Sequence, residues 1–85
     1  MAIVFIPPQL QALTGAAQVE VAGNTVREVV EHLEKQFPGI RQRLFEDDQL
    51  SPMLQLSVDH VMTRAVLTSV KSATEVHFLP IIGGG

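Results

Sequence analysis

The residues most suggestive of chemistry are three consecutive glycines, Gly83, Gly84 and Gly85, with which the sequence ends. Glycine loses more backbone entropy on ordering than any other residue, so such a segment does not pack by itself. One interpretation is that these glycines are a frayed end or residues left over from cloning. The other is that the terminal carboxylate of Gly85 is the reactive group, because a tail without Cβ atoms can thread a narrow tunnel in another enzyme.

The residues just before the glycines fit the second interpretation. Pro80 stiffens the chain, and the apolar side chains of Ile81 and Ile82 can anchor the tail where the glycines begin. A tail that another protein modifies would also account for a domain without catalytic side chains of its own.

The other side chains offer little chemistry. The histidines, His32, His60 and His77, lie in a predicted helix, turn and strand, without the spacing of metal ligands. His60 and His77 can be neighbours on a sheet, but two histidines without a third ligand make a weak metal site. The chain has no Cys and no Ser in a G-x-S-x-G context, and the acidic run 46–48 lacks the spacing of a calcium loop. We therefore expect no catalytic side chain, no metal and no bound cofactor.

Composition narrows the class of protein. The chain has 85 residues, enough for one domain, and its hydrophobic content of 46% is typical of a packed globule. The formal net charge is −3 and no block of Lys or Arg occurs, which argues against a nucleic-acid partner. No apolar run approaches the length of a membrane span, and no cationic leader precedes an apolar segment. These features predict a cytoplasmic protein that does not associate with membranes.

The elements that must position the tail begin with two strands. Residues 2–6 are apolar and rich in β-branched side chains, and Pro7-Pro8 stops them, which favours a central strand. Residues 18–21 alternate polar and apolar and predict a second strand, antiparallel to the first. Between them, Leu10 and Leu13 are expected to face the core.

The strongest periodicity covers residues 25–37 and predicts a helix. Five apolar side chains share one stripe, and they are Val26, Val29, Val30, Leu33 and Phe37. Thr25 and Glu28 have the spacing of a capping box, and Pro38-Gly39 ends the helix. Residues 40–45 predict a second short helix, and the acidic residues 46–48 a solvated loop.

The second half of the chain supplies the remaining strands. Residues 54–58 predict a third strand, a turn at Asp59-His60 leads to a short strand at 61–62, and residues 75–79 form the last strand. Leu67 and Val70 are isolated apolar anchors between them. The order predicts an α+β domain in which one main helix packs across a mixed sheet of four to five strands. We expect the domain to span residues 1–80 and a flexible tail to span 81–85.

These residues resemble the ubiquitin-like sulfur carriers of the MoaD/ThiS family, which have the β-grasp fold. Segment 8–15 is similar to the family's L-R-x-L-x-G region, Asn24-Thr25-Val26 opens the helix, and Phe37-Pro38 closes it. Residues 75–85 are similar to the family's E-V-x-x-x-P-x-x-x-G-G ending. The pairs Pro7-Pro8 and Leu79-Pro80, with Leu13-Thr14-Gly15, look most like the CysO-type subgroup.

Three departures from the family pattern weaken an assignment to molybdopterin synthase. Gln11 stands where the family usually has Arg, Asp59-His60 replaces an Asn-Gly turn, and Ala73-Thr74 replaces Gly-Asp. None of them affects the tail, whose chemistry needs only Gly84-Gly85.

The resemblance implies a sulfur-transfer cycle. An E1-like adenylating enzyme of the MoeB/ThiF type would use ATP and Mg²⁺ to activate the Gly85 carboxylate, and a sulfur donor would convert it to a thiocarboxylate. A second, sulfur-accepting enzyme would take the sulfur into cysteine, a cofactor or another metabolite. The alternatives are the small subunit of molybdopterin synthase, a ubiquitin-like protein modifier, and an interaction module whose tail does nothing.

The resemblance also implies a docking surface on the exposed face of the sheet. If Val76 and Phe78 face the helix, Leu79 faces outward, and the family pattern places Met62 beside it. Leu79, Met62 and Pro7 would form a small apolar patch for partner proteins, with His77 at its border.

Overall fold

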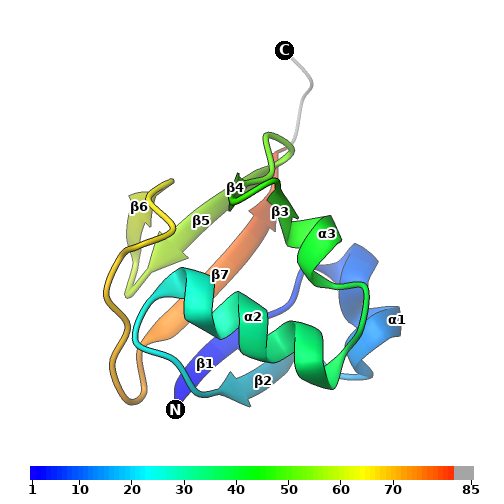
Figure 1. The fold of residues 1–85 in the computed structure, drawn as a ribbon, viewed down its shortest axis with the longest axis horizontal. Helices are drawn as coiled ribbons and strands as arrows, with labels where there is room; N and C mark the ends of the chain where they lie inside the picture. The colour runs from blue at the N-terminus through cyan, green and yellow to red at the C-terminus, as the bar shows by residue number, and fades with distance from the viewer. Residues whose placement is uncertain (82–85) are drawn as a thin grey trace.

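A mixed five-stranded sheet forms the framework of the domain, and one long helix packs across it (Figure 1). The structure, a computed structural model, describes residues 1–81. The strands lie side by side in the order β2-β1-β7-β5-β6. Their bounds are β1 Ala2–Phe5, β2 Gln18–Val21, β5 Leu54–Val58, β6 Val61–Thr63 and β7 Glu75–Pro80. The α+β architecture and all five predicted strands are confirmed.

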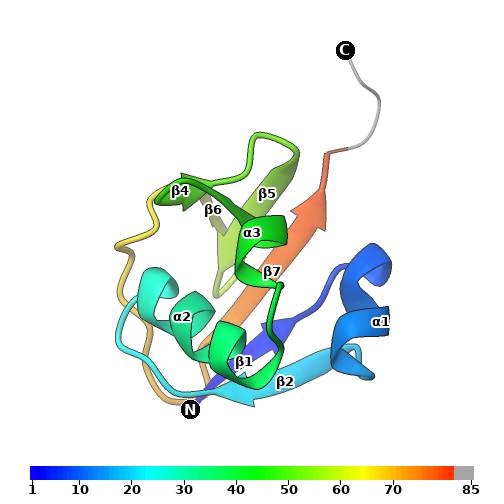
Figure 2. The ribbon, with the colours of Figure 1, turned by 45° about the vertical axis from the view of Figure 1, so that its right-hand side comes forward.

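The strand pairings place the first and last strands at the centre. β1 pairs antiparallel with β2, as predicted, and parallel with β7. β5 pairs antiparallel with both β7 and β6. Because β7 runs away from the N-terminus, its last residue lies at the opposite end of the sheet (Figures 1 and 2).

The core lies between the sheet and α2 (Val26–Gln36). Four members of the predicted stripe, Val26, Val29, Val30 and Leu33, are buried, whereas Phe37 follows the helix as its C-cap and is half-buried. Alternate residues of the central strands meet the stripe, including Val4, Leu56, Val76 and Phe78. Burial of such a side chain contributes about 1.5–3 kcal/mol, so this interface holds the helix in place. Thr25 caps α2, since its hydroxyl accepts a hydrogen bond from the Glu28 amide at 3.2 Å.

A carboxylate links the end of α2 to the next helix, α3 (Arg41–Leu44). The Glu34 side chain accepts hydrogen bonds from the Gly39 amide at 2.9 Å and from the Arg41 amide at 2.9 Å. These two backbone hydrogen bonds, helped by the Arg41 charge, hold the pKa of Glu34 below its ordinary value.

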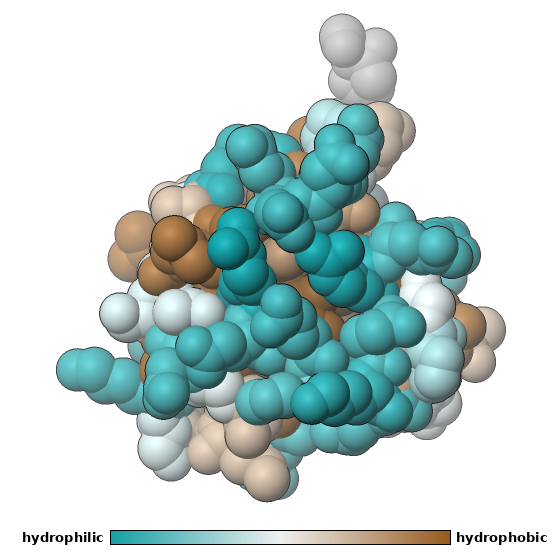
Figure 3. All heavy atoms as spheres, in the orientation of Figure 1, coloured by the Kyte–Doolittle hydropathy of each residue, from teal (hydrophilic) through white to brown (hydrophobic). Residues whose placement is uncertain are grey.

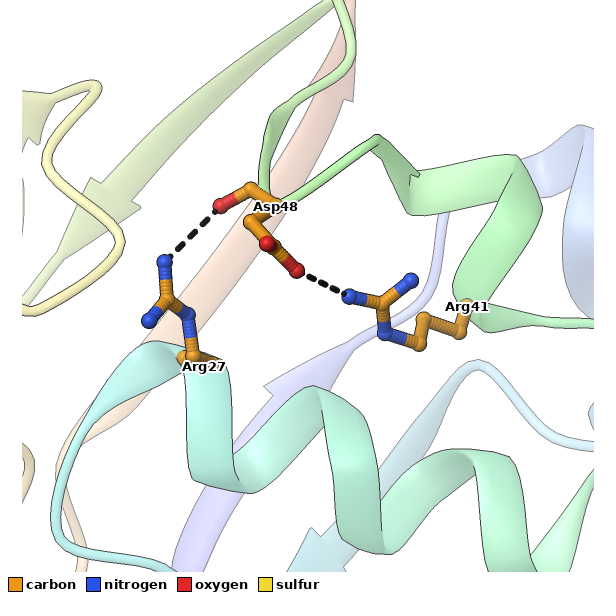
Figure 4. Close-up of polar contacts among 3 residues, drawn as sticks. All are labelled: Arg27, Arg41 and Asp48. Atoms are coloured by element: carbon orange, nitrogen blue, oxygen red, sulfur yellow. Dashed lines mark hydrogen bonds and ion pairs between the residues drawn. The ribbon is translucent and has the colours of Figure 1, made fainter.

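Residues 45–50 correct two predictions, because Phe45 does not belong to the short helix expected at 40–45 and Glu46 does not belong to a loop. They form a short hairpin of β3 (Phe45–Glu46) and β4 (Gln49–Leu50), with its turn at Asp47-Asp48. Asp48 ties this turn to both helices, because its carbonyl accepts from Arg27 at 3.1 Å and its carboxylate pairs with Arg41 at 2.9 Å (Figure 4). The three acidic residues are exposed, as predicted, and Asp48 also joins the hairpin to α2 and α3.

Two predicted core residues are exposed. Leu13 lies on α1 (Gln11–Thr14), a single turn that follows the 3-10 helix η1 (Pro8–Leu10), and only Leu10 of this region is buried. Leu67 stands in a turn closed by the Thr68 amide and the Ala65 carbonyl at 3.0 Å, which directs it outward. Val66 and the predicted Val70 are buried instead. No helix within residues 1–81 is both long enough and apolar enough to span a bilayer.

Gly23 is expected to tolerate no side chain. Its φ is +151°, and an added Cβ would lie 2.8 Å from Cγ2 and 2.9 Å from the backbone nitrogen of Val29. Gly23→Ala should therefore lower the free energy of unfolding by about 2–4 kcal/mol, measured by urea denaturation. Gly15→Ala, at φ +70° with nothing within 4 Å, is the matched control. It should cost about 1 kcal/mol from backbone strain alone, and equal losses would contradict the predicted clash.

Glu34 is expected to make stability depend on pH. Its pKa in the folded state lies below the ordinary value of 4.5. The stabilisation is therefore complete above the unfolded pKa and is lost as the pH falls through the folded pKa. Unfolding of the unaltered protein and of Glu34→Gln should differ most near neutral pH and converge below the folded pKa. Glu31→Gln, on the same helix, should behave as the unaltered protein across the series; a constant offset for Glu34→Gln would contradict the assignment.

Candidate functional site

The base of the predicted tail is fixed by backbone hydrogen bonds. Pro80, the last residue of β7, pairs with Leu54 of β5. One residue further on, the Ile81 amide donates to the Met53 carbonyl at 3.0 Å. Ile81 is therefore held by the loop before β5. The predicted site residues Ile82, Gly83, Gly84 and Gly85 lie outside the described residues, and their roles stay predictions.

The face of the sheet opposite α2 carries the side chains predicted for docking, and we call it the outer face. The strand register sets one row across all five strands, consisting of Gln18, Phe5, His77, Ser57 and Met62. Leu79 points to the same side because it alternates with the buried Phe78. The α2 side, by contrast, is covered mainly by hydrophilic residues, and its largest group of exposed hydrophobic atoms lies on the side of β6 (Figure 3).

Three exposed apolar side chains of the outer face lie near the base of the tail, and we call them the outer-face patch. They are Met62, Leu79 and Ile81, which are 56%, 40% and 41% exposed. An open pocket of about 290 Å³ adjoins the patch and is lined by Gln55, Leu56, Met62, Thr63, Arg64 and Ile81. The predicted outward positions of Leu79 and Met62 are confirmed, and the patch continues to Ile81.

Pro7 does not belong to this patch, which corrects the prediction that it is exposed there. Pro7 is buried. The chain folds back at this point into η1, and the Pro7 carbonyl accepts the Leu10 amide at 2.9 Å. A partner that docks on the outer face therefore meets no Pro7 side chain.

His77 lies on the outer face, as predicted, at the middle strand of the sheet, and it stacks on Phe5. The two rings are parallel to within 5°, with centroids 4.0 Å apart. His60 is the predicted neighbour of His77, at 6.2 Å between centroids, and its Nε2 lies 3.9 Å from a Glu75 carboxylate oxygen. Within residues 1–81 no group of three or more His, Asp or Glu side chains is placed to hold a metal ion. His32, on α2, is partly exposed and contacts the Ala22 carbonyl through Nδ1 at 2.6 Å.

Sequence reasoning missed two contributors to this region. The Met53 carbonyl has no sequence signal, since every residue carries a carbonyl, and its role depends on the end of β7 reaching the loop before β5. The sequence indicated the outward position of Phe5 only weakly. Residues 2–6 are apolar on both faces of the strand, so one of the two alternating sets of side chains had to point away from the helix.

The model of the ThiS family matches residues 4–85 of this sequence. The chain belongs to the ThiS family. The match covers the five-stranded sheet, α2 and the glycine ending, and it establishes the β-grasp fold and the predicted likeness to ubiquitin-like sulfur carriers. No curated protein shows significant similarity to this sequence.

Solved structures agree with this assignment. A chain in the crystal structure of the Amycolatopsis orientalis BexX/CysO complex is similar at 29% identity and a TM-score of 0.92, with 100% of each chain covered. Mycobacterium tuberculosis CysO is similar at 26% identity and a TM-score of 0.89, over 96% of this chain and 100% of that one. The small archaeal modifier protein 1 of Methanosarcina acetivorans shares 20% identity at a TM-score of 0.83, over 99% and 95%, and shows the fold alone.

Proposed function

We propose that this member of the ThiS family carries sulfur on its C-terminal Gly85 and is a substrate of its partners rather than an enzyme. The observation that carries the proposal is the family match, which runs through residue 85 and includes the glycine ending. The similarity to Mycobacterium tuberculosis CysO and to a chain of the BexX/CysO complex supports it.

The proposed cycle begins on the main-chain carboxylate. An E1-like enzyme of the MoeB/ThiF type joins the Gly85 carboxylate to the α-phosphate of ATP, with Mg²⁺ in the enzyme's site, and releases pyrophosphate. A carboxylate is a poor electrophile, and the resulting acyl-adenylate has a good leaving group. A sulfide-equivalent nucleophile then attacks the carbonyl carbon and expels AMP, leaving a thiocarboxylate. The use of ATP is compatible with the expected cytoplasmic location.

The thiocarboxylate sulfur is the group that the protein delivers. Sulfur is softer and more nucleophilic than a carboxylate oxygen, and it attacks an electrophilic carbon of an acceptor bound by a second enzyme, displacing a leaving group from that carbon. Water then cleaves the bond between the sulfur and the Gly85 carbonyl carbon, which leaves the sulfur on the acceptor and regenerates the Gly85 carboxylate. The side chains described above bind partners and hold the tail, and none of them takes part in bond making.

Activation at Gly85 predicts a change of mass. With its activating enzyme, ATP, Mg²⁺ and sulfide, the intact protein should gain the mass difference between a sulfur and an oxygen atom. Deleting Gly84-Gly85 should abolish the gain. Gly85→Ala should slow it at least about tenfold, since a steric penalty of only 1.4 kcal/mol in a tunnel that admits no Cβ is enough for that factor.

Three other observations would favour the alternative functions. An isopeptide bond to a lysine of another protein would indicate a modifier. A permanent complex with a larger catalytic subunit would indicate the small subunit of molybdopterin synthase. An unchanged mass, together with full function of Gly85→Ala in cells, would indicate an interaction module.

The outer-face patch predicts where the activating enzyme binds. Leu79→Thr and Met62→Thr should each raise its KM for this protein about five- to tenfold, because each removes about 1–1.4 kcal/mol of apolar burial. The kcat should change little, and the free energy of unfolding should stay within about 1 kcal/mol, since both side chains are exposed. Leu13→Thr is the matched control, because Leu13 is 41% exposed but lies on α1. An equal rise in KM for Leu13→Thr would contradict a specific patch.

A further inference from the structure

Arg64 follows β6 and makes an unusual set of contacts with the loop between β4 and β5. Its Nη1 donates to the Leu54 carbonyl at 2.8 Å, and its Nη2 donates to the carbonyls of Ser51 at 3.1 Å and Leu50 at 3.3 Å. A guanidinium carries five donors in a rigid fork, so one side chain can hold three carbonyls of a bend at once. No carboxylate within residues 1–81 forms an ion pair with Arg64, so these carbonyls are its partners.

The loop that Arg64 holds is the one that holds the base of the tail. Met53 lies inside it, and the Met53 carbonyl accepts the Ile81 amide at 3.0 Å. Within the loop, the Leu54 amide donates to the Ser51 carbonyl at 3.1 Å, and the Met53 amide donates to the Ser51 hydroxyl at 3.2 Å.

Packing fixes the two ends of this loop, where Leu50 and Leu54 are buried, but not its middle. The Met53 side chain is 70% exposed, and Pro52 is exposed beside it. The orientation of the Met53 carbonyl therefore depends on the hydrogen bonds of the loop. The Ser51 amide donates one of them to the Leu44 carbonyl at 2.9 Å, and Arg64, which follows β6, supplies three more.

We propose that Arg64 is a positioning residue that fixes, through the loop 50–54, the direction in which the chain leaves β7 at Ile81. This inference rests on the proposed function for its biological meaning, because only a tail that must enter a partner's active site gains from a fixed base. A fixed base reduces the entropy lost on entry, which raises affinity without a new contact.

The decisive experiment compares Arg64→Ala, Arg64→Lys and the unaltered protein by ¹⁵N NMR relaxation. In Arg64→Ala the order parameter of the Ile81 amide should fall from about 0.8 to about 0.6 or below, while that of Val76 at the centre of β7 stays near 0.85. Arg64→Lys keeps the charge and three donors and should lie between the two. Lys35→Ala removes an exposed cation from the last turn of α2, away from this loop, and should leave Ile81 unchanged.

The activation assay then separates positioning from direct contact. Arg64→Ala should raise the KM of the activating enzyme for this protein about fivefold with kcat nearly unchanged, and Arg64→Lys should recover most of the loss. A raised KM with an unchanged Ile81 order parameter would overturn the inference, since Arg64 would then contact the partner directly. An unchanged Ile81 order parameter with unchanged KM would overturn it as well.

Failure of the proposed function would look different. The unaltered protein would then receive no adenylate from the activating enzyme, whatever stands at position 64. The inference about the tail base would still be decided, because the order parameter of Ile81 is measured without a partner. Thermal unfolding of both variants shows whether the domain is intact, and if Arg64→Ala does not fold, Arg64→Lys decides by the same two measurements.

Discussion

The structure depends on the parallel pairing of β1 with β7 at the centre of the sheet. This pairing joins the first and last strands of the domain, so the sheet closes only when nearly the whole chain is in place, and a large loop-closure entropy is lost. The β1 contacts end at Phe5 and His77, whereas β5 stays paired with β7 as far as Pro80. The last residues of β7 consequently pair with β5 alone. On the same side, the Met53 carbonyl in the loop before β5 accepts the Ile81 amide.

Alternate side chains of β7 point to opposite faces of the sheet, one toward the core and the other toward solvent. Val76 and Phe78 are buried against the helix, and His77 and Leu79 lie on the outer face. A slip of the register by one residue would exchange the two sets, so the core that stabilises the fold also fixes which side chains are offered to a partner. The stacking of His77 on Phe5 extends this coupling to β1.

The sequence was sufficient for elements with strong periodicity and insufficient for contacts between distant segments. The stripe of α2 and the alternation of residues 54–58 and 75–79 predicted the helix, the strands and the outward position of Leu79. The hairpin at 45–50 was missed because two-residue strands have no period, and Asp48 meets Arg27 and Arg41 only after the helices pack. Pro7 and Leu13 were misplaced for a similar reason, since the turn of η1 and α1 decides which of them is covered.

The proposed cycle attaches sulfur to the main-chain carboxylate of Gly85 and needs no thiol side chain, which agrees with a sequence that contains no Cys. A thiol side chain would be held within a folded surface, whereas a terminus built from glycine can enter an active site that encloses it. In the proposed cycle the domain supplies a surface that the activating enzyme recognises and a fixed start for the tail. The exposed apolar side chains of the outer-face patch fit the first of these. The hydrogen bond from Ile81 to the Met53 carbonyl, in a loop held by Arg64, fits the second.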